Sequence, residues 1–163
     1  MLIAAESNKY CGYGIDPSNN AIQQGNKQYS NLHLETGTAD NLPYENGFFK
    51  VVIFGFCLYL VDRDLLMRTI AEADRVLGDK GFIIITDFDS IMPHKRKYHH
   101  LPDREIYSYK MDYAQLFFGC PHYALVEKIS YSHQSEFFCK DMSERVATTI
   151  LYKDVGIYSL CQR

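Results

Sequence analysis

The chain of 163 residues contains no tryptophan and no long apolar stretch. None of its apolar runs approaches the roughly 20 residues that a membrane-spanning helix needs, so we expect no membrane partner. The chain also lacks an excess of charge of one sign, because 17 Lys and Arg residues stand against 20 Asp and Glu residues. The net charge of −3 offers a nucleic acid no electrostatic attraction, so we do not expect a nucleic-acid partner either.

A disulfide framework is a second absence. The cysteines are odd in number and widely spaced, at Cys11, Cys57, Cys120, Cys139 and Cys161. This pattern is typical of reduced thiols in a cytoplasmic protein. The first residues, Met1 to Glu6, are too short and carry the wrong charge for a signal peptide. We therefore expect a cytoplasmic location.

What the chain does contain is a large apolar and aromatic fraction. Hydrophobic residues make up 47% of it, with 13 Tyr and 10 Phe. A chain of this length can bury a core of its own, and no linker or repeat divides it. We therefore expect one domain over residues 1–163.

Strand and helix patterns alternate in the first two-thirds of the chain. The expected elements are strand 10–15, a helix from Ser18 to Tyr29, strand 32–37, strand 48–54, a helix from Asp62 to Gly78, and strand 82–86. Ser18 and Asp62 stand where helix N-caps are expected, and Gly78 where a left-handed residue often ends a helix. The alternation predicts a parallel sheet with helices on its faces, and the almost unbroken apolar run at 48–54 is typical of a strand covered on both faces.

The last third has a different pattern. Residues 93–109 are polar, basic and aromatic with little periodicity, which indicates a long loop. Residues 112–118 can form a short helix that ends before Gly119 and Pro121. Two alternating segments, 123–133 and 145–152, have no helix between them, so we expect an antiparallel strand pair.

Four segments carry the strongest functional signal: an acid that ends the first strand at 13–16, an Ala-Asp-Asn-Leu-Pro sequence at 39–43, an apolar strand at 51–56, and a helix, glycine turn and strand at 75–87. In this order and spacing they resemble the middle of a class I S-adenosylmethionine-dependent methyltransferase. The resemblance implies an α/β Rossmann-like fold, with a mostly parallel sheet and a C-terminal antiparallel strand pair.

The resemblance also assigns cofactor contacts. Asp16 would accept hydrogen bonds from the ribose hydroxyls of S-adenosylmethionine. Asp40 or its neighbour Asn41 would bind the adenine amino group, Leu42 would pack near the base, and Gly55 and Phe56 would face the methionine part. On the residues alone, Asp16 reads equally as a helix cap, Asp40 as part of a surface turn and Phe56 as core.

The segment 93–113 is expected to be an insertion loop on the acceptor side. We expect His99 or His100 to act as a base if the acceptor must lose a proton, since a histidine titrates near neutral pH. The residues expected beside the acceptor are Tyr98, Tyr107, Tyr109, Lys110 and Tyr113. A solvated, mildly basic loop is the alternative. The histidines lack the Cys, His and carboxylate spacing of a closed metal site, so no metal is expected.

The family's first strand and glycine-rich loop would lie before Met1, and Met1 to Ser7 resemble the last turns of the helix that follows them, so we expect an N-terminally truncated fold. A missing central strand would leave backbone groups without partners. Three arrangements would satisfy them: the strand from Tyr10 pairs with 48–54, a second copy fills the gap as a homodimer, or the natural protein is longer.

The sequence therefore supports two classes of function. The first is methyl transfer from S-adenosylmethionine to a small-molecule or sugar-like acceptor. The second is a non-catalytic, methyltransferase-like binding or scaffolding subunit. A third reading, a domain that binds NAD, also uses an acid after the second strand, but residues 40–43 and the antiparallel ending count against it.

Overall fold

The computed structural model describes residues 12–100, 103–135 and 137–158. Its elements are β1 (Gly12–Asp16), α1 (Asn19–Gln28), β2 (Leu32–Thr36), β3 (Phe49–Gly55), the 3-10 turn η1 (Leu58–Leu60), α2 (Arg63–Val76), β4 (Leu77–Phe88), β5 (His94–Lys97), β6 (Tyr107–Lys110), α3 (Gln115–Phe118), β7 (Tyr123–Ser132), β8 (Arg145–Lys153) and the 3-10 turn η2 (Val155–Ile157). The expectations for Met1 to Ser7 and for the strand start at Tyr10 lie outside the described residues. No helix in the described part of the chain is long and apolar enough to cross a membrane.

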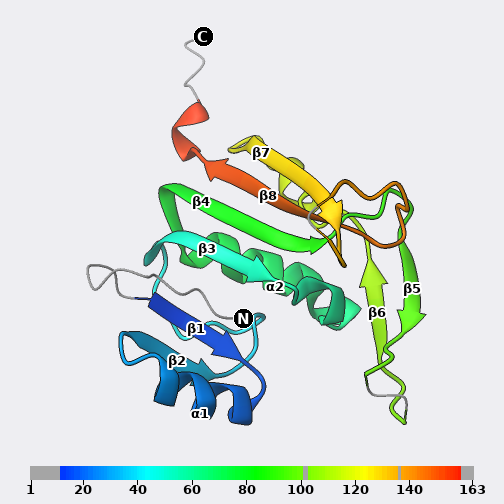
Figure 1. Ribbon diagram of the computed structural model, residues 1–163. Coiled ribbons are helices and arrows are strands. Elements are labelled where there is room, and N and C mark those ends of the chain that lie inside the picture. Colours follow the sequence, from blue (N-terminus) through cyan, green and yellow to red (C-terminus); the bar gives the residue numbers. More distant parts are fainter. Residues whose placement is uncertain (1–11, 101–102, 136, 159–163) are drawn as a thin grey trace.

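The main sheet has the strand order β3-β4-β8-β7. β3 and β4 are parallel, whereas β8 is antiparallel to both β4 and β7. A separate parallel pair, β1-β2, lies beside β3, and the arrows of β1 to β4 point toward the same edge (Figure 1). The α/β fold with a C-terminal antiparallel pair is thus confirmed.

Both expected helix N-caps are present. Ser18 accepts a hydrogen bond from the Ala21 backbone N–H at 3.3 Å, and the Asp62 side chain accepts one from Asp64 at 3.3 Å. The expected left-handed end at Gly78 is wrong, because α2 ends at Val76 and the extended backbone of Leu77 leads directly into β4. Gly78 instead allows the backbone of Gly47 to lie close to β4, since a Cβ at Gly78 would lie 3.0 Å from the carbonyl oxygen of Gly47.

The core lies between one face of the main sheet and α2. Leu66, Ile70, Ala73 and Leu77, which recur at helical spacing in the sequence, are all buried. They belong to one cluster with Ile83 and Ile85 of β4, Leu151 of β8 and Phe117 of α3. Burial of this apolar stripe is the main force that holds α2 on the sheet.

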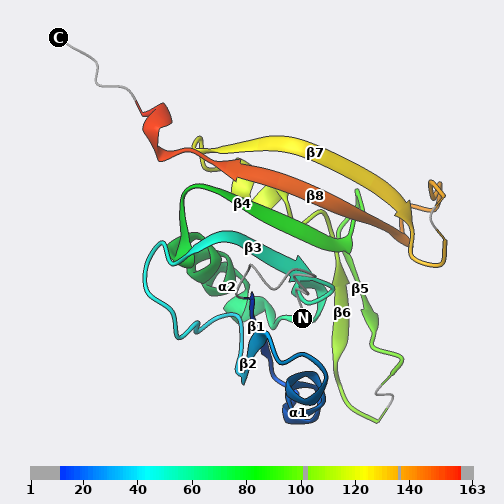
Figure 2. The same cartoon turned by 60° about the vertical axis from the view of Figure 1, so that its left-hand side comes forward.

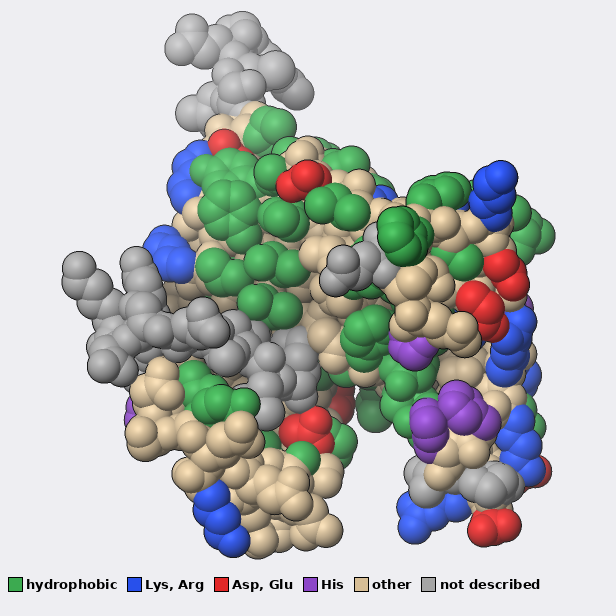
Figure 3. All heavy atoms as spheres, viewed as in Figure 1, with side chains coloured by type: hydrophobic (Ala, Val, Ile, Leu, Met, Phe, Trp, Pro, Cys, Tyr) green, Lys and Arg blue, Asp and Glu red, His purple; other side chains and the backbone are tan. Residues whose placement is uncertain are grey.

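The opposite face of the main sheet stays exposed among the described residues. Hydrophobic side chains gather over β4 and β8 on the side that faces the viewer (Figure 3). Phe82 alternates with buried Ile83 along β4 and is 37% exposed, and Val51 of β3 is 42% exposed. The prediction that the 48–54 strand is covered on both faces is therefore wrong for the part of the chain that the structure describes.

The strand pairing suggested for the first strand is also wrong within these residues. β1 and β3 belong to different sheets, so the first strand does not pair directly with the 48–54 strand. Aromatic rings connect the two sheets instead. The Tyr13 ring lies edge-on to Phe48 at 5.4 Å and to Phe49 at 5.6 Å between centroids.

The expected long loop at 93–109 contains a β-hairpin, which corrects that prediction. β5 pairs with β6 in antiparallel register, from His94 opposite Lys110 to Lys97 opposite Tyr107. The hairpin runs across the direction of β4 and β8 (Figures 1 and 2). Its strands have only four residues each, too few to give a clear period in the sequence.

The base of the hairpin is fixed by buried charge. Asp89, 3% exposed, lies just before the hairpin and Asp112 just after it. The Lys128 ammonium from β7 contacts both carboxylates, at 2.6 Å and 2.9 Å. Arg145 adds a second cation at 2.9 Å from Asp89. These buried charges are paired with opposite charges, and they fix the position at which the hairpin leaves the sheet.

Gly81 gives a direct test of the close packing where β4 begins. A Cβ at Gly81 would lie 2.6 Å from the Leu77 side chain and 2.9 Å from the carbonyl oxygen of Lys50. We expect Gly81→Ala to lower the free energy of unfolding by about 1–3 kcal/mol, measured by urea denaturation. The control is Gly119→Ala, where a Cβ would meet nothing within 4 Å. Equal unfolding midpoints for the two variants would contradict this view of β4.

Candidate functional site

The carboxyl ends of β1 to β4 lie along one edge of the fold, which is where open α/β sheets bind ligands. Asp16 ends β1 and Gly55 ends β3. The Gly37 backbone N–H donates to the carbonyl oxygen of Asp16 at 3.2 Å, so the end of β2 is tied to the end of β1.

Asp16 is half-buried, and its carboxylate has a local role. Its Oδ1 accepts a hydrogen bond from the Ser18 backbone N–H at 2.8 Å. The capping geometry considered from the sequence is therefore present. It orients the carboxylate at the strand end.

The segment 38–43 is held by an ion pair on α2. The Leu42 N–H donates to Glu72 at 2.8 Å, while Arg75 donates to the Leu42 carbonyl oxygen at 2.9 Å. Hydrogen bonds from Arg75 are the main reason that the pKa of Glu72 falls to about 2. Asp40 is half-buried and Asn41 is exposed on this segment. Sequence reasoning missed Glu72 and Arg75, although their spacing of three residues places them side by side on a helix.

The loop after β3 has a strained start. The left-handed residue there is Phe56, with φ of 50°, directly after Gly55. Its N–H donates to the Thr86 carbonyl oxygen at 2.7 Å, which extends the contact between β3 and β4 by one residue. A bulky residue in this region of backbone space needs support from its surroundings.

Asp87 provides that support. Its side chain is 2% exposed and accepts hydrogen bonds from the backbone N–H groups of Leu58 at 3.0 Å, Tyr59 at 3.3 Å and Phe88 at 2.8 Å. Burial raises the pKa of this carboxyl to about 7, against the lowering effect of the N–H donors. Burial also raises the pKa of the neighbouring Cys57 thiol to about 12, which makes it a poor nucleophile. The role of Asp87 was not predicted; an acid near the end of a strand that is mainly apolar from Phe82 onward is the signal that could have found it.

A pocket of about 290 Å³ opens beside this loop and is called here the hairpin pocket. Its lining residues are Phe56, Tyr59, Phe88, Arg96, Lys97, Tyr98, His99, His100, Ser108, Lys110, His133 and Glu144. The structure thus brings Phe56, expected on the cofactor side, together with the histidine pair expected on the acceptor side. The His99 and His100 rings are exposed and 3.9 Å apart.

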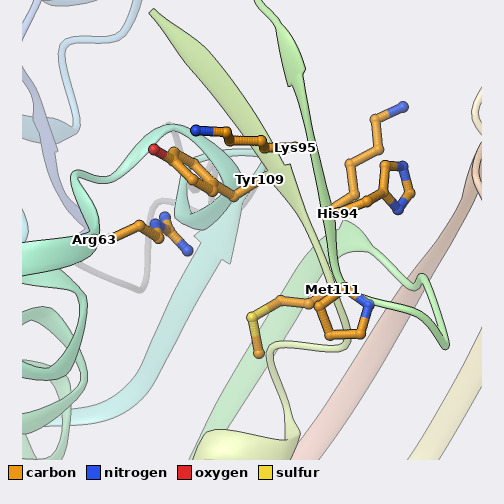
Figure 4. Close-up of a pocket in the computed structure, with 7 residues that line it drawn as sticks. Arg63, His94, Lys95, Tyr109 and Met111 are labelled. Atoms are coloured by element: carbon orange, nitrogen blue, oxygen red, sulfur yellow. The ribbon is translucent and has the colours of Figure 1, made fainter.

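The remaining tyrosines of the hairpin lie elsewhere. Tyr109 lines a second pocket of about 270 Å³, where the guanidinium of Arg63 lies 4.3 Å from its ring centroid (Figure 4). The Lys95 ammonium lies 4.5 Å from the Tyr107 ring centroid. Successive side chains of β6 point to opposite sides, so Tyr107 and Tyr109 are separated from Ser108 and the hairpin pocket.

Tyr113 is a core residue and not a surface one. Its side chain is 1% exposed within the main cluster. Its hydroxyl donates to the Tyr109 carbonyl oxygen at 2.6 Å and accepts from Arg63 at 3.1 Å. Tyr113, which is expected beside the acceptor, thus lies in the core with its hydroxyl bonded to the end of the hairpin and to Arg63. As for metals, the described residues contain no group of three or more His, Cys, Asp or Glu side chains placed to bind an ion.

Buried Asp87 predicts a pH effect on stability. Its native pKa of about 7 lies above the ordinary value near 4, so between these pH values the folded chain binds a proton that the unfolded chain releases. Stability should therefore fall as pH rises from 4 to 7, by up to about 1.4 kcal/mol per pH unit. Asp87→Asn removes this titration. If Asp87→Asn is less stable than the native chain, the difference between their unfolding free energies should shrink as the pH rises toward 7. Urea denaturation at several pH values measures this difference. A difference that does not change with pH would contradict the assignment.

Comparison with known proteins agrees with this geometry. A protein of Staphylococcus haemolyticus described as demethylmenaquinone methyltransferase is 38% identical over 74 residues, which cover 44% of this chain and 30% of that relative. The match thus spans less than a third of the relative. Among solved structures, an S-adenosylmethionine-dependent methyltransferase of Methanosarcina mazei superposes with a TM-score of 0.68 at 14% identity, over 87% of this chain and 81% of that one.

A second solved structure is a Burkholderia thailandensis 1,6-didemethyltoxoflavin-N1-methyltransferase with 1,6-didemethyltoxoflavin and S-adenosylhomocysteine bound. It superposes with a TM-score of 0.66 at 12% identity, over 87% of this chain and 60% of that one. At such identities these structures support the fold. Residues 2–85, more than half of the chain, match the model of the family described as methyltransferase domain. This chain belongs to the methyltransferase domain family.

Proposed function

We propose that the chain transfers a methyl group from S-adenosylmethionine to a small-molecule or sugar-like acceptor. One observation carries the proposal: Phe56, at the carboxyl end of β3, lines the same pocket as His99 and His100 of the hairpin. A side chain on the proposed cofactor edge and a candidate base thus share one cavity. Membership of the methyltransferase domain family supports the same reaction.

The residues along the sheet edge suit this cofactor. A carboxylate offers about four acceptor positions, so Asp16 can keep its bond to Ser18 and also accept from a ribose hydroxyl. Asp40, Asn41 and Leu42 lie on the segment that Glu72 and Arg75 hold, where they would contact the adenine. Gly55 and Phe56 would contact the methionine part. When bound, S-adenosylmethionine would supply a methyl group whose carbon an acceptor oxygen or nitrogen attacks, while the bond from that carbon to the sulfonium sulfur breaks and S-adenosylhomocysteine leaves.

The hairpin pocket would hold and align the acceptor. Alignment supplies much of the acceleration in an in-line displacement, so fixed walls matter. We assign the acceptor contacts to Tyr98 and Lys110, because both line this pocket. His99 or His100 would take the proton that a hydroxyl or amine acceptor loses on methylation, which requires a neutral imidazole.

A second function, that of a binding or scaffolding subunit, is favoured by the exposed apolar face of the main sheet. Phe82 on β4 and Ile129 on β7, which the strand register places on the same face, are 37% and 54% exposed, and contiguous apolar surface is typical of contacts with another chain. A second copy of this chain is the partner we propose for this face. Light scattering on the purified chain measures its oligomeric state.

Calorimetric titration with S-adenosylhomocysteine tests the cofactor site. We expect one-to-one binding with a micromolar dissociation constant. Asp16→Ala should weaken it about tenfold to a hundredfold, because a hydrogen bond to a charged group contributes about 1.5–3 kcal/mol. The matched control is Asp64→Ala, an exposed acid on α2, which should leave the constant unchanged. Circular dichroism verifies that each variant folds.

The outcomes separate the two functions. Equal affinities for the Asp16 and Asp64 variants would remove Asp16 from the site. A folded oligomer that binds no S-adenosylhomocysteine would contradict methyl transfer by this chain and favour the scaffolding role.

A further inference from the structure

The hairpin pocket has two chemically different walls. One wall is aromatic, with Phe56 edge-on to His133 at 5.4 Å and Tyr59 edge-on to Phe88 at 5.2 Å between ring centroids. Rings that meet edge to face leave flat surfaces and slots between them, where another ring can make the same kind of contact. A cavity of about 290 Å³ exceeds the roughly 150 Å³ that holds one benzene ring, so it has room for a substituted ring.

The other wall is cationic. Arg96, Lys97 and Lys110 line it, and Glu144 is the single carboxylate of the lining. Glu144 contacts both Arg96 and Lys110, the latter at 3.3 Å, so one negative charge is shared between two positive ones. Lys97 lies opposite Tyr107 in the register of the hairpin, so its side chain is on the other side of the hairpin, and Arg96 and Lys110 carry the charge of this wall. The wall therefore keeps an excess of positive charge.

The position of Lys110 strengthens this charge. The residue is 6% exposed, and its ammonium lies 4.1 Å from the Phe88 ring centroid. It donates to the Ser143 carbonyl oxygen at 3.1 Å, which fixes it between the aromatic and cationic walls. A buried cation with one shared, 42% exposed counter-charge is screened less by water than a surface lysine.

We infer that the acceptor is a planar aromatic molecule that carries an anionic group, such as an aromatic carboxylate. Its ring would contact Phe56, Phe88 and Tyr59, and its carboxylate would lie by Arg96 and Lys110. The uncharged ring suits the aromatic wall, and only a negatively charged group can pair with the cations of the other wall. That the ligand is the methyl acceptor rests on the proposed function, whereas the chemical class of the ligand follows from the lining of the pocket.

Paired probes test the ligand class. Binding of 4-hydroxybenzoate and of its neutral counterpart 4-hydroxybenzyl alcohol to the full chain is measured by ligand-observed NMR titration. We expect the carboxylate to bind at least about tenfold more tightly at low salt, and the difference to shrink as the ionic strength rises. Equal binding of the two probes, or binding of neither, would overturn the inference.

Arg96 and Lys95, neighbours on β5 with side chains on opposite sides of the hairpin, provide the matched variants. Arg96→Gln should reduce the preference for the carboxylate about threefold to tenfold, as expected for a partly exposed charge. Lys95→Gln should leave the preference unchanged, because Lys95 lies over the Tyr107 ring and lines the other pocket. Both side chains are exposed, so neither variant should fail to fold. An equal effect of the two variants would show a general surface charge and overturn the inference.

Titration of the same samples with S-adenosylhomocysteine separates this inference from the proposed function. Cofactor binding without a preference for the carboxylate would overturn the ligand class alone. A carboxylate preference without cofactor binding would support the ligand class and count against methyl transfer.

Discussion

The buried Asp87 carboxylate is the contact on which the site depends. It lies near the end of β4 and accepts three backbone N–H groups, two of them from the turn that follows β3. These bonds hold the strained Phe56 backbone and place Phe56 and Tyr59 in the wall of the hairpin pocket. Keeping an acid in an apolar core is costly, and three hydrogen bonds that converge on it offset that cost. Burial of the Asp87 side chain thus costs stability at the position that sets the geometry of the site.

A second set of buried charges positions the opposite wall. Lys128 joins Asp89 and Asp112 at the two ends of the hairpin, so its base is fixed to β7. The alternation of side chains along β6 then sends Lys110 toward the hairpin pocket and leaves Tyr109 beside Arg63. The site thus combines one wall from the sheet edge and one from an inserted hairpin, each held by its own buried acid.

The described sheet is covered unevenly. α2 and α3 bury one face, whereas Phe82 and Ile129 remain exposed on the other. The small sheet of β1 and β2 meets the main sheet through the ring contacts of Tyr13 with Phe48 and Phe49. Each such contact contributes only about 0.5–1.5 kcal/mol beyond burial. Side-chain packing thus contributes to the position of β1, whose last residue is Asp16, relative to β3.

The sequence by itself determined the elements whose signals are local. The caps at Ser18 and Asp62, the helical spacing of the α2 core residues and the alternation in β7 and β8 each depend on neighbours within a few residues, so they could be predicted. The order of these elements also predicted the fold and the family. Only the tertiary structure decided the hairpin at 94–110, the burial of Tyr113 and the roles of Asp87 and Glu72. These depend on partners far along the chain, such as Asp87 with Leu58 and Glu72 with Leu42, which no local period records.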